Sequence, residues 1–213
     1  HDVVGEFSAG TGSLAAFAKN AGAKLVLNEL SSRRAAVLQE VFPDTKVYTE
    51  DAEQIDNLLP DDVKPTAVII NPPFSSNANT GMKGNEVGIR HVEQALARLE
   101  PGGRLVAILG RGMAMDKPSY AAWWGKMRDT YDVRAIIPVD GSGYAKYGTT
   151  FDNVLVVIDK IPSKNRLPIT ESASKYEDLI GLLSEVRNER EPVRIAADII
   201  DESEPDADRG EGE

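Results

Sequence analysis

The chain has 213 residues, 41% of them hydrophobic, which suits one domain with a full-sized core, and it has no apolar stretch near the ~18 residues of a membrane span. It contains no cysteine and two histidines, which excludes disulfides and thiolate metal sites and leads us to expect no metal and a reducing, cytoplasmic setting. Most of the formal net charge of −10 lies in residues 185–213, with 11 acidic and 4 basic residues. The first 184 residues are near neutral, which excludes a protein that binds nucleic acid strongly by itself.

An alternation of strand and helix patterns runs along the chain. Apolar and β-branched runs predict strands near residues 2–6, 24–28, 46–48, 67–70, 104–109, 133–138 and 153–159. Helical spacing predicts helices near residues 12–21, 31–42, 52–58, 86–99, 118–130 and 175–190. The loop between the last two strands is too short for a crossover helix, so this pair should be antiparallel. The pattern predicts an α/β fold with a mostly parallel sheet.

The first expected strand runs into a glycine turn and a helix, Val-Val-Gly-Glu-Phe-Ser-Ala-Gly-Thr-Gly-Ser-Leu-Ala over residues 3–15. Gly10 and Gly12 allow positive φ and a close approach of the backbone to a ligand. Such turns also hold phosphates, so the turn alone names no particular ligand. The next strand ends in Glu29, a little under ~20 residues further on, where such folds accept ribose hydroxyls. The alternative for Glu29 is a helix cap on the surface.

Asn71-Pro72-Pro73-Phe74 directly follows the buried-strand pattern of residues 67–70. The prolines end the strand because neither can donate a backbone N–H. Asn71 is therefore presented at the carboxyl end of a central strand, where open α/β sheets bind ligands. Its amide, the Pro72 carbonyl and the Phe74 ring can together hold a planar exocyclic amine. The alternative is a strand and a tight turn, with Phe74 buried in the core.

Taken together, these segments resemble class I S-adenosylmethionine-dependent methyltransferases that methylate amines, above all the DNA adenine-N6 methyltransferases. Within that group the chain is similar to the modification subunits of type I restriction systems and to helicase-associated methylases, over about residues 3–160. Residues 6–12 match the first family motif, with Phe7 where proline is more usual. Glu29 matches the second motif, Asp51 the third, and residues 71–74 the catalytic fourth.

The resemblance implies a Rossmann-like fold whose seven-stranded sheet ends in an antiparallel hairpin, S-adenosyl-L-methionine as cofactor, and adenine in DNA as methyl acceptor. The catalytic residues that it implies are Asn71, Pro72, Pro73 and Phe74. The cofactor-binding residues that it implies are Glu6, Phe7, Ser8, Ala9, Gly10, Gly12, Glu29, Asp51, Ala52 and Asn71. For Asp51 a simple helix N-cap is the alternative, and both roles can coexist. The target adenine would have to be flipped out of the duplex and stacked on Phe74.

Two loops and one helix residue complete the candidates. Residues 141–151 resemble the eighth family motif, in which an aromatic residue packs against the target base. The candidates there are Tyr144 and Tyr147 for the base and Lys146 for a phosphate, with a purely structural role for the tyrosines as the alternative. The polar loop over residues 75–85 either orders over the nucleotide or serves as a linker. His91 lies in a predicted helix, and we expect it to be structural or to face solvent.

We expect a methyltransferase domain over residues 1–165, a partly helical extension over residues 166–200, and an acidic, disordered tail over residues 201–213. The chain begins at its first strand, which leaves no room for the N-terminal cofactor motif of the family, and no segment is large enough for a target-recognition domain. We therefore expect a piece of a larger protein, or one that relies on partner subunits. Two alternatives stay open: methylation of RNA or of protein glutamine, which similar turns serve, and a non-catalytic methyltransferase-like module.

Overall fold

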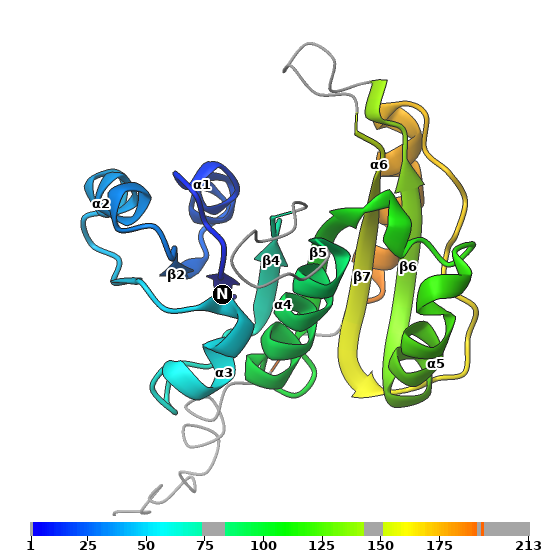
Figure 1. Cartoon of the computed structure of the whole chain (residues 1–213), viewed down its shortest axis with the longest axis horizontal. Coiled ribbons are helices and arrows are strands. Elements are labelled where there is room, and N and C mark those ends of the chain that lie inside the picture. The colour runs from blue at the N-terminus through cyan, green and yellow to red at the C-terminus, as the bar shows by residue number, and fades with distance from the viewer. Residues whose placement is uncertain (1, 74–83, 143–150, 191–192, 194–213) are drawn as a thin grey trace, which may run out of the picture.

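The computed structural model describes residues 2–73, 84–142, 151–190 and 193. Its core is a seven-stranded sheet in the order β3-β2-β1-β4-β5-β7-β6 (Figure 1). The strands are β1 (Val3–Glu6), β2 (Lys24–Asn28), β3 (Val47–Tyr48), β4 (Ala67–Ile70), β5 (Arg104–Gly110), β6 (Tyr131–Val139) and β7 (Asn153–Pro162). Among the described strands, only β7 pairs antiparallel with its neighbours, β5 and β6. The mostly parallel, seven-stranded sheet with an antiparallel C-terminal hairpin, which the sequence analysis predicts, is confirmed.

Helices cover both faces of the sheet. They are α1 (Ser13–Asn20), α2 (Ser32–Val41), α3 (Ile55–Leu58), α4 (Gly84–Arg98), α5 (Ala121–Thr130) and α6 (Tyr176–Asn188), with short 3₁₀ turns η1 (Ala52–Gln54), η2 (Arg111–Met113) and η3 (Pro118–Tyr120). The largest apolar cluster joins α3, α4 and α5 to one face of the sheet. Separate clusters join α1 and α2 to β2, and α6 to β6 and β7. Figure 1 shows α6 behind the strands that α5 covers from the front.

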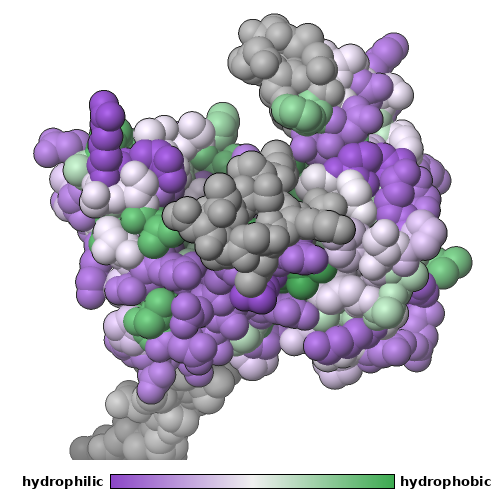
Figure 2. Space-filling model, in the orientation of Figure 1, coloured by the Kyte–Doolittle hydropathy of each residue, from purple (hydrophilic) through white to green (hydrophobic). Residues whose placement is uncertain are grey.

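The packing explains why these segments adopt these structures. In β4, Val68 and Ile70 are buried on the face that α4 covers. Successive residues of a strand point to opposite faces, and both faces of this sheet are covered, so the strand is apolar throughout. The α4 residues Val92, Ala95, Leu96 and Leu99 recur at helical spacing and are all buried. Hydrophilic residues dominate the described part of the face drawn in Figure 2, with hydrophobic residues scattered among them.

Some boundaries differ from those that the sequence predicts. The segment expected as one helix over residues 52–58 starts as the 3₁₀ turn η1, and residues 118–120 form the 3₁₀ turn η3 before α5. The strand β6 begins at Tyr131, earlier than expected, because the polar residue Asp132 is buried there and ion-pairs with Arg166 at 3.1 Å. Burial of a paired charge thus extends a strand through residues that look like a loop.

A buried arginine ties α6 to the sheet. The guanidinium of Arg104 on β5 contacts both carboxylate oxygens of Asp159 on β7, at 2.6 and 2.8 Å. It also donates to the carbonyl of Val186 near the end of α6, at 2.8 Å. Because a buried charge needs such partners, this contact fixes where α6 ends on the sheet. Among the residues that the structure describes, no helix is long and apolar enough to cross a membrane.

Candidate cofactor pocket

The carboxyl ends of β1, β2, β3 and β4 meet at one edge of the sheet, and a cavity of about 320 Å³ lies there. Open α/β sheets bind ligands at this edge. The cavity is lined by Phe7, Ser8, Gly10, Glu29, Leu30, Arg34, Asp51, Ala52, Glu53, Asn71, Pro73, Val87 and His91. The structure therefore brings residues from all four expected motifs onto one cavity.

The two glycines of the turn after β1 serve different purposes. Both have positive φ, 58° at Gly10 and 91° at Gly12, which favours glycine. A Cβ on Gly12 would lie 2.5 Å from the Phe42 ring, so Gly12 allows the turn to pack against α2. A Cβ on Gly10 would meet nothing within 4 Å, and Gly10 lines the cavity. The open space in front of Gly10 leaves room for a ligand against the backbone.

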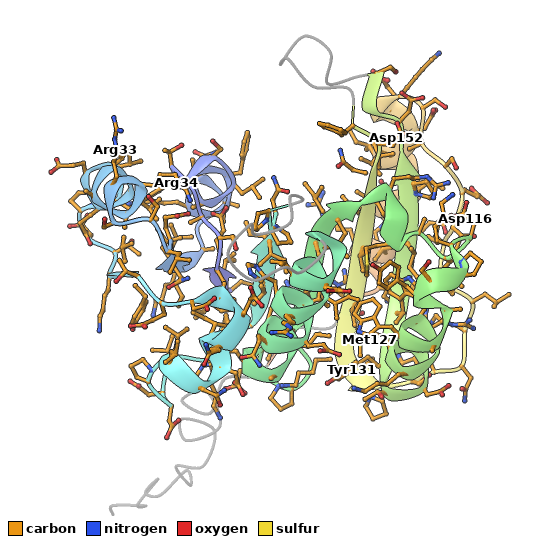
Figure 3. All side chains as sticks on the ribbon, in the orientation of Figure 1. Arg33, Arg34, Asp116, Met127, Tyr131 and Asp152 are labelled. Atoms are coloured by element: carbon orange, nitrogen blue, oxygen red, sulfur yellow. The ribbon has the colours of Figure 1, made fainter. Side chains whose placement is uncertain are left out.

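The Glu29 carboxylate links the glycine turn to the start of α2. Oε2 accepts from the Gly10 N–H at 2.9 Å. Oε1 accepts from the Ser31 N–H at 2.8 Å and from Nε and Nη2 of Arg34 at 3.1 and 2.7 Å. Figure 3 shows Arg34 on α2, where Arg33 projects outward. Glu29 is only 4% exposed, so it does not lie on the surface, although its bond from the Ser31 N–H is a cap-like contact at the start of α2. Its carboxylate presents a buried acceptor beside the cavity.

Asp51 both caps a helical turn and lines the cavity. Its Oδ1 accepts from the Glu53 N–H at 2.9 Å, which makes it the N-cap of η1. The next residue, Ala52, is buried and also lines the cavity. The capping role that the sequence offers as an alternative is thus present, and the carboxylate remains at the cavity wall.

His91 lines the cavity, a role that the sequence analysis does not predict. Its Nδ1 lies 3.1 Å from the Ser8 hydroxyl, and its side chain is buried on α4. Burial lowers the pKa of His91 to about 4, against an opposing effect of the nearby Asp51 charge, so the imidazole is neutral near pH 7. Of the two roles expected for His91, structural or solvent-facing, burial contradicts the solvent-facing one. The available signal was its spacing of four residues from Val87, which places both on one face of α4.

Four of the expected site residues are not among those that line the cavity: Glu6, Ala9, Gly12 and Pro72. Glu6 is buried, accepts from the Ala15 N–H, and has an Oε2 without a hydrogen-bond partner among the described residues. Burial is the main cause that raises the pKa of Glu6 to about 7, with a smaller contribution from Glu29. Glu6 therefore carries a proton part of the time at neutral pH.

The turn after β4 contributes Asn71 and Pro73 to the cavity wall. Asn71 is exposed, whereas Pro72 between them is buried. Phe74, Tyr144, Lys146 and Tyr147 lie outside the described residues, as does most of the loop over residues 75–85. Within the described part of the chain, no cluster of three or more potential metal ligands is found.

The methyltransferase small domain model matches residues 2–125, more than half of the chain. The chain belongs to this family. A comparison with curated proteins finds no match.

Solved structures resemble this methyltransferase over most of its length. The methyltransferase subunit of a type I restriction-modification system from Streptococcus thermophilus has a TM-score of 0.68 at 13% identity, covering 90% of this chain and 48% of that one. A putative class I S-adenosylmethionine-dependent methyltransferase from Listeria monocytogenes has a TM-score of 0.63 at 12% identity, covering 88% and 63%. At these identities the likeness shows the fold. The chain spans about half the length of the type I subunits that it matches.

The cofactor follows from the family and the fold. A putative methyltransferase from Streptococcus mutans, solved in complex with SAH, has a TM-score of 0.51 at 14% identity, covering 75% of this chain and 88% of that one. RNA methyltransferases are also among the matched structures. The chain is a methyltransferase domain with the class I fold, and S-adenosyl-L-methionine is its cofactor. The cavity residues fit that group, since Gly10 leaves open space at the backbone and Glu29 and Asp51 provide acceptors.

Proposed function

We propose that this methyltransferase transfers a methyl group to the exocyclic N6 amine of adenine in DNA, as part of a larger restriction-modification or helicase-associated protein. The observation that carries the proposal is that Asn71, which follows β4, lines the same cavity as Ser8, Glu29 and Asp51. An amide that can accept from an amine therefore lies on the cavity that fits the methyl donor. Without this shared cavity, the Asn-Pro-Pro turn would be only a strand terminator.

The proposed cofactor contacts come from the loops that follow β1, β2 and β3. Backbone at Ser8 and Gly10 passes beside the methionine part, because Gly10 has no side chain to fill that space. Glu29 accepts from the ribose hydroxyls, since Oε2 has one protein donor, Gly10, among the described residues and a carboxylate oxygen can take two. Asp51 accepts from the adenine amine of the cofactor, and Ala52 offers its backbone N–H to the ring.

Asn71 and the Pro72 carbonyl perform the chemical step by positioning. The exocyclic amine of adenine is a poor nucleophile because its lone pair is delocalised into the ring. When the Asn71 Oδ1 and the Pro72 carbonyl accept its two N–H groups, the lone pair turns toward the methyl donor. S-adenosyl-L-methionine supplies a methyl group that its sulfonium already activates. The nitrogen forms the new bond to carbon as the carbon–sulfur bond breaks, and it then loses a proton; alignment of these atoms supplies much of the rate.

The target base must leave the duplex before it can reach Asn71. Flipping costs a few kcal/mol of unstacking, and we propose that Phe74, Tyr144 and Tyr147 recover part of this cost by stacking, with Lys146 on a phosphate. The first 184 residues hold 23 acidic and 20 basic residues, which is too balanced for strong phosphate binding. Further domains or subunits would therefore supply most of the DNA affinity.

Transfer of a tritiated methyl group to candidate acceptors tests the proposal. The acceptors are DNA free of N6-methyladenine, RNA transcripts, and a glutamine-containing peptide, followed by nucleoside analysis. We expect label in DNA, as N6-methyladenine. Label only in RNA would favour the RNA methyltransferases among the matched structures, and label only in peptide would favour a protein methyltransferase; either outcome contradicts the adenine proposal.

The Asn71→Ala variant tests the role of the amide. We expect loss of at least a thousandfold in transfer rate with the dissociation constant for S-adenosyl-L-methionine changed less than threefold, because the amide acts on the acceptor. Asn57→Ala, which changes an exposed asparagine on α3, is the matched control and should retain full activity. Unchanged transfer by Asn71→Ala would remove Asn71 from its proposed role.

A further inference from the structure

Asn28 joins three loops at the edge of the sheet that carries the cavity. It is the last residue of β2 and is fully buried. Its Nδ2 donates to the carbonyls of Phe7 and Glu50 at 3.0 and 2.9 Å. Its Oδ1 accepts from the Glu50 N–H at 2.8 Å, and its own backbone carbonyl accepts from the Ala9 N–H at 3.0 Å. One residue thus holds the loop after β1 and the loop after β3 at fixed positions.

The Asn28 side chain takes the place of a peptide group at the end of the strand pairing. Pairing of β1 with β2 ends at Glu6 and Leu27, and pairing of β2 with β3 ends at Asn28 and Tyr48. A side-chain amide has the same donor and acceptor as a peptide unit. With Glu50 it forms a closed pair of hydrogen bonds, and its second N–H continues the connection to β1. The hydrogen bonds of the Asn28 side chain thereby extend the connection between the strands beyond their last paired residues.

The loops that Asn28 connects carry the two halves of the cavity wall. Ser8 and Gly10 come directly after Phe7, and Asp51 and Ala52 directly after Glu50; all four line the cavity. Asn28 is absent from the lining residues, so it acts through its neighbours. We propose that Asn28 is a positioning residue that sets the distance between the methionine side and the adenine side of the cofactor pocket. This inference rests on the cofactor contacts proposed above.

The chemistry predicts which changes disrupt this spacing. In Asn28→Asp, a carboxylate would face the carbonyls of Phe7 and Glu50 with no proton to donate. In Asn28→Leu, a side chain of similar size would leave those carbonyls and the Glu50 N–H without this partner. Buried polar groups that lose their partner seek another, so in either variant the two loops should shift relative to each other.

Two ligands distinguish positioning from general damage. S-adenosylhomocysteine spans both sides of the pocket, whereas adenosine alone occupies the adenine and ribose side. In the Asn28 variants we expect the dissociation constant to rise at least tenfold for S-adenosylhomocysteine and less than threefold for adenosine. A protein that is merely less stable would lose affinity for both ligands in the same proportion. Calorimetry on the folded protein measures the dissociation constant for S-adenosylhomocysteine, and NMR titration measures the constant for adenosine.

Thr66 provides the matched control at the opposite end of the strands. It is 1% exposed, accepts from the Val3 N–H at 3.0 Å and donates to Asp2 at 2.7 Å. Thr66→Val therefore removes a buried cross-strand connection of the same kind, away from the cavity. We expect it to lower the melting temperature while the ratio of the two dissociation constants stays at the value of the unchanged protein.

Three outcomes would overturn the inference. The first is a ratio of the two dissociation constants that is unchanged in Asn28→Asp and Asn28→Leu. The second is a change of this ratio in Thr66→Val as large as the change in the Asn28 variants. If neither Asn28 variant folds, Asn28→Ser, which retains one short polar group, replaces them in the same comparison. The third is failure of the unchanged protein to bind S-adenosylhomocysteine, which contradicts the proposed cofactor contacts and removes this inference with them; binding by the unchanged protein isolates the role of Asn28.

Discussion

In its proposed role, the Glu29 carboxylate accepts from the protein and from the ribose at the same time. Gly10, Ser31 and Arg34 already donate to it, which holds its two oxygens in place beside the cavity. A carboxylate has about four acceptor sites, so Oε2 retains capacity for a ribose hydroxyl. The hydrogen bonds from the protein orient this acceptor before the cofactor arrives, which reduces the cost of binding.

Glu29→Gln tests that role with little change in shape. We expect the dissociation constant for S-adenosylhomocysteine to rise about tenfold or more, because hydrogen bonds to a charged acceptor contribute about 1.5–3 kcal/mol. Calorimetry gives the constant directly. Glu40→Gln, on the exposed side of α2, should bind as the unchanged protein does. Equal affinities for all three proteins would refute the ribose contact.

At the scale of elements, the turn between β1 and α1 depends on a close approach to α2. A Cβ on Gly12 would lie 2.5 Å from Phe42 and 2.8 Å from Leu38, two buried residues of the cluster under α1 and α2. The backbone there has φ of 91°, which an L side chain rarely adopts. Both effects oppose a larger residue, so Gly12 is required for packing independently of any ligand.

Gly12→Ala should therefore lower the free energy of unfolding by about 2 kcal/mol or more. Gly125→Ala is the control: Gly125 lies within α5, and its Cβ would meet nothing within 4 Å. Alanine there should raise stability by roughly 0.5–1 kcal/mol. Urea unfolding measures both values, and equal stability of the two variants would show that the turn relaxes around the added methyl group.

The helix α6 presents one apolar side to the sheet and one side to solvent. Val186 is 3% exposed and belongs to the cluster with Ala135 and Val157, whereas Ile180 is 48% exposed. Val186→Asp should cost about 3 kcal/mol or more because it buries a charge without a partner. Ile180→Asp should change stability by less than about 0.5 kcal/mol. If thermal unfolding shows the same loss for both, α6 does not pack on the sheet in solution.

For the whole molecule, two buried groups of the pocket region give opposite dependences of stability on pH. The raised pKa of Glu6, about 7, means that the folded protein keeps a proton that the unfolded chain releases above about 4.5. Stability therefore falls as pH rises from about 4.5 to about 7. The lowered pKa of His91, about 4, has the reverse effect, and stability rises between about pH 4 and 6.5.

Comparison of Glu6→Gln with the unchanged protein isolates the first dependence. The variant cannot ionise, so its stability relative to the unchanged protein should increase steadily from about pH 4.5 to about 7, by on the order of 2–3 kcal/mol. Chemical unfolding at several pH values in one buffer system measures this difference. A difference that is constant across the range would show that Glu6 titrates normally in the folded protein.

The sequence predicts the positions of the strands along the chain better than it predicts contacts between side chains. Apolar runs locate β4 and β5 because strands buried on both faces need such runs. Their positions after predicted strands indicate Glu29 and Asn71, and the family resemblance indicates Asp51. Local patterns carry no information on the contact of Ser8 with His91, 83 residues apart. Nor do they reveal Asn28, whose amide is fixed by partners 21 and 22 residues away.

The same limit applies at the far end of the sheet. Asp132 lies outside the strand expected over residues 133–138, whereas Arg134 and Asp159 fall within expected strands, and all three are buried on β6 and β7. Their ion pairs form only when the two strands and residues further along the chain come together. Sequence patterns therefore predict the apolar framework of this fold, whereas its polar connections emerge only with the complete tertiary structure.

A crystal structure with sinefungin tests whether Asn71 faces the reactive group of the methyl donor. We expect sinefungin in the cavity with its ribose at Glu29, its adenine at Asp51, and the amine that replaces the methyl sulfonium directed at Asn71. Sinefungin bound elsewhere, or bound in this cavity with the Asn71 amide turned away from that amine, would contradict the account.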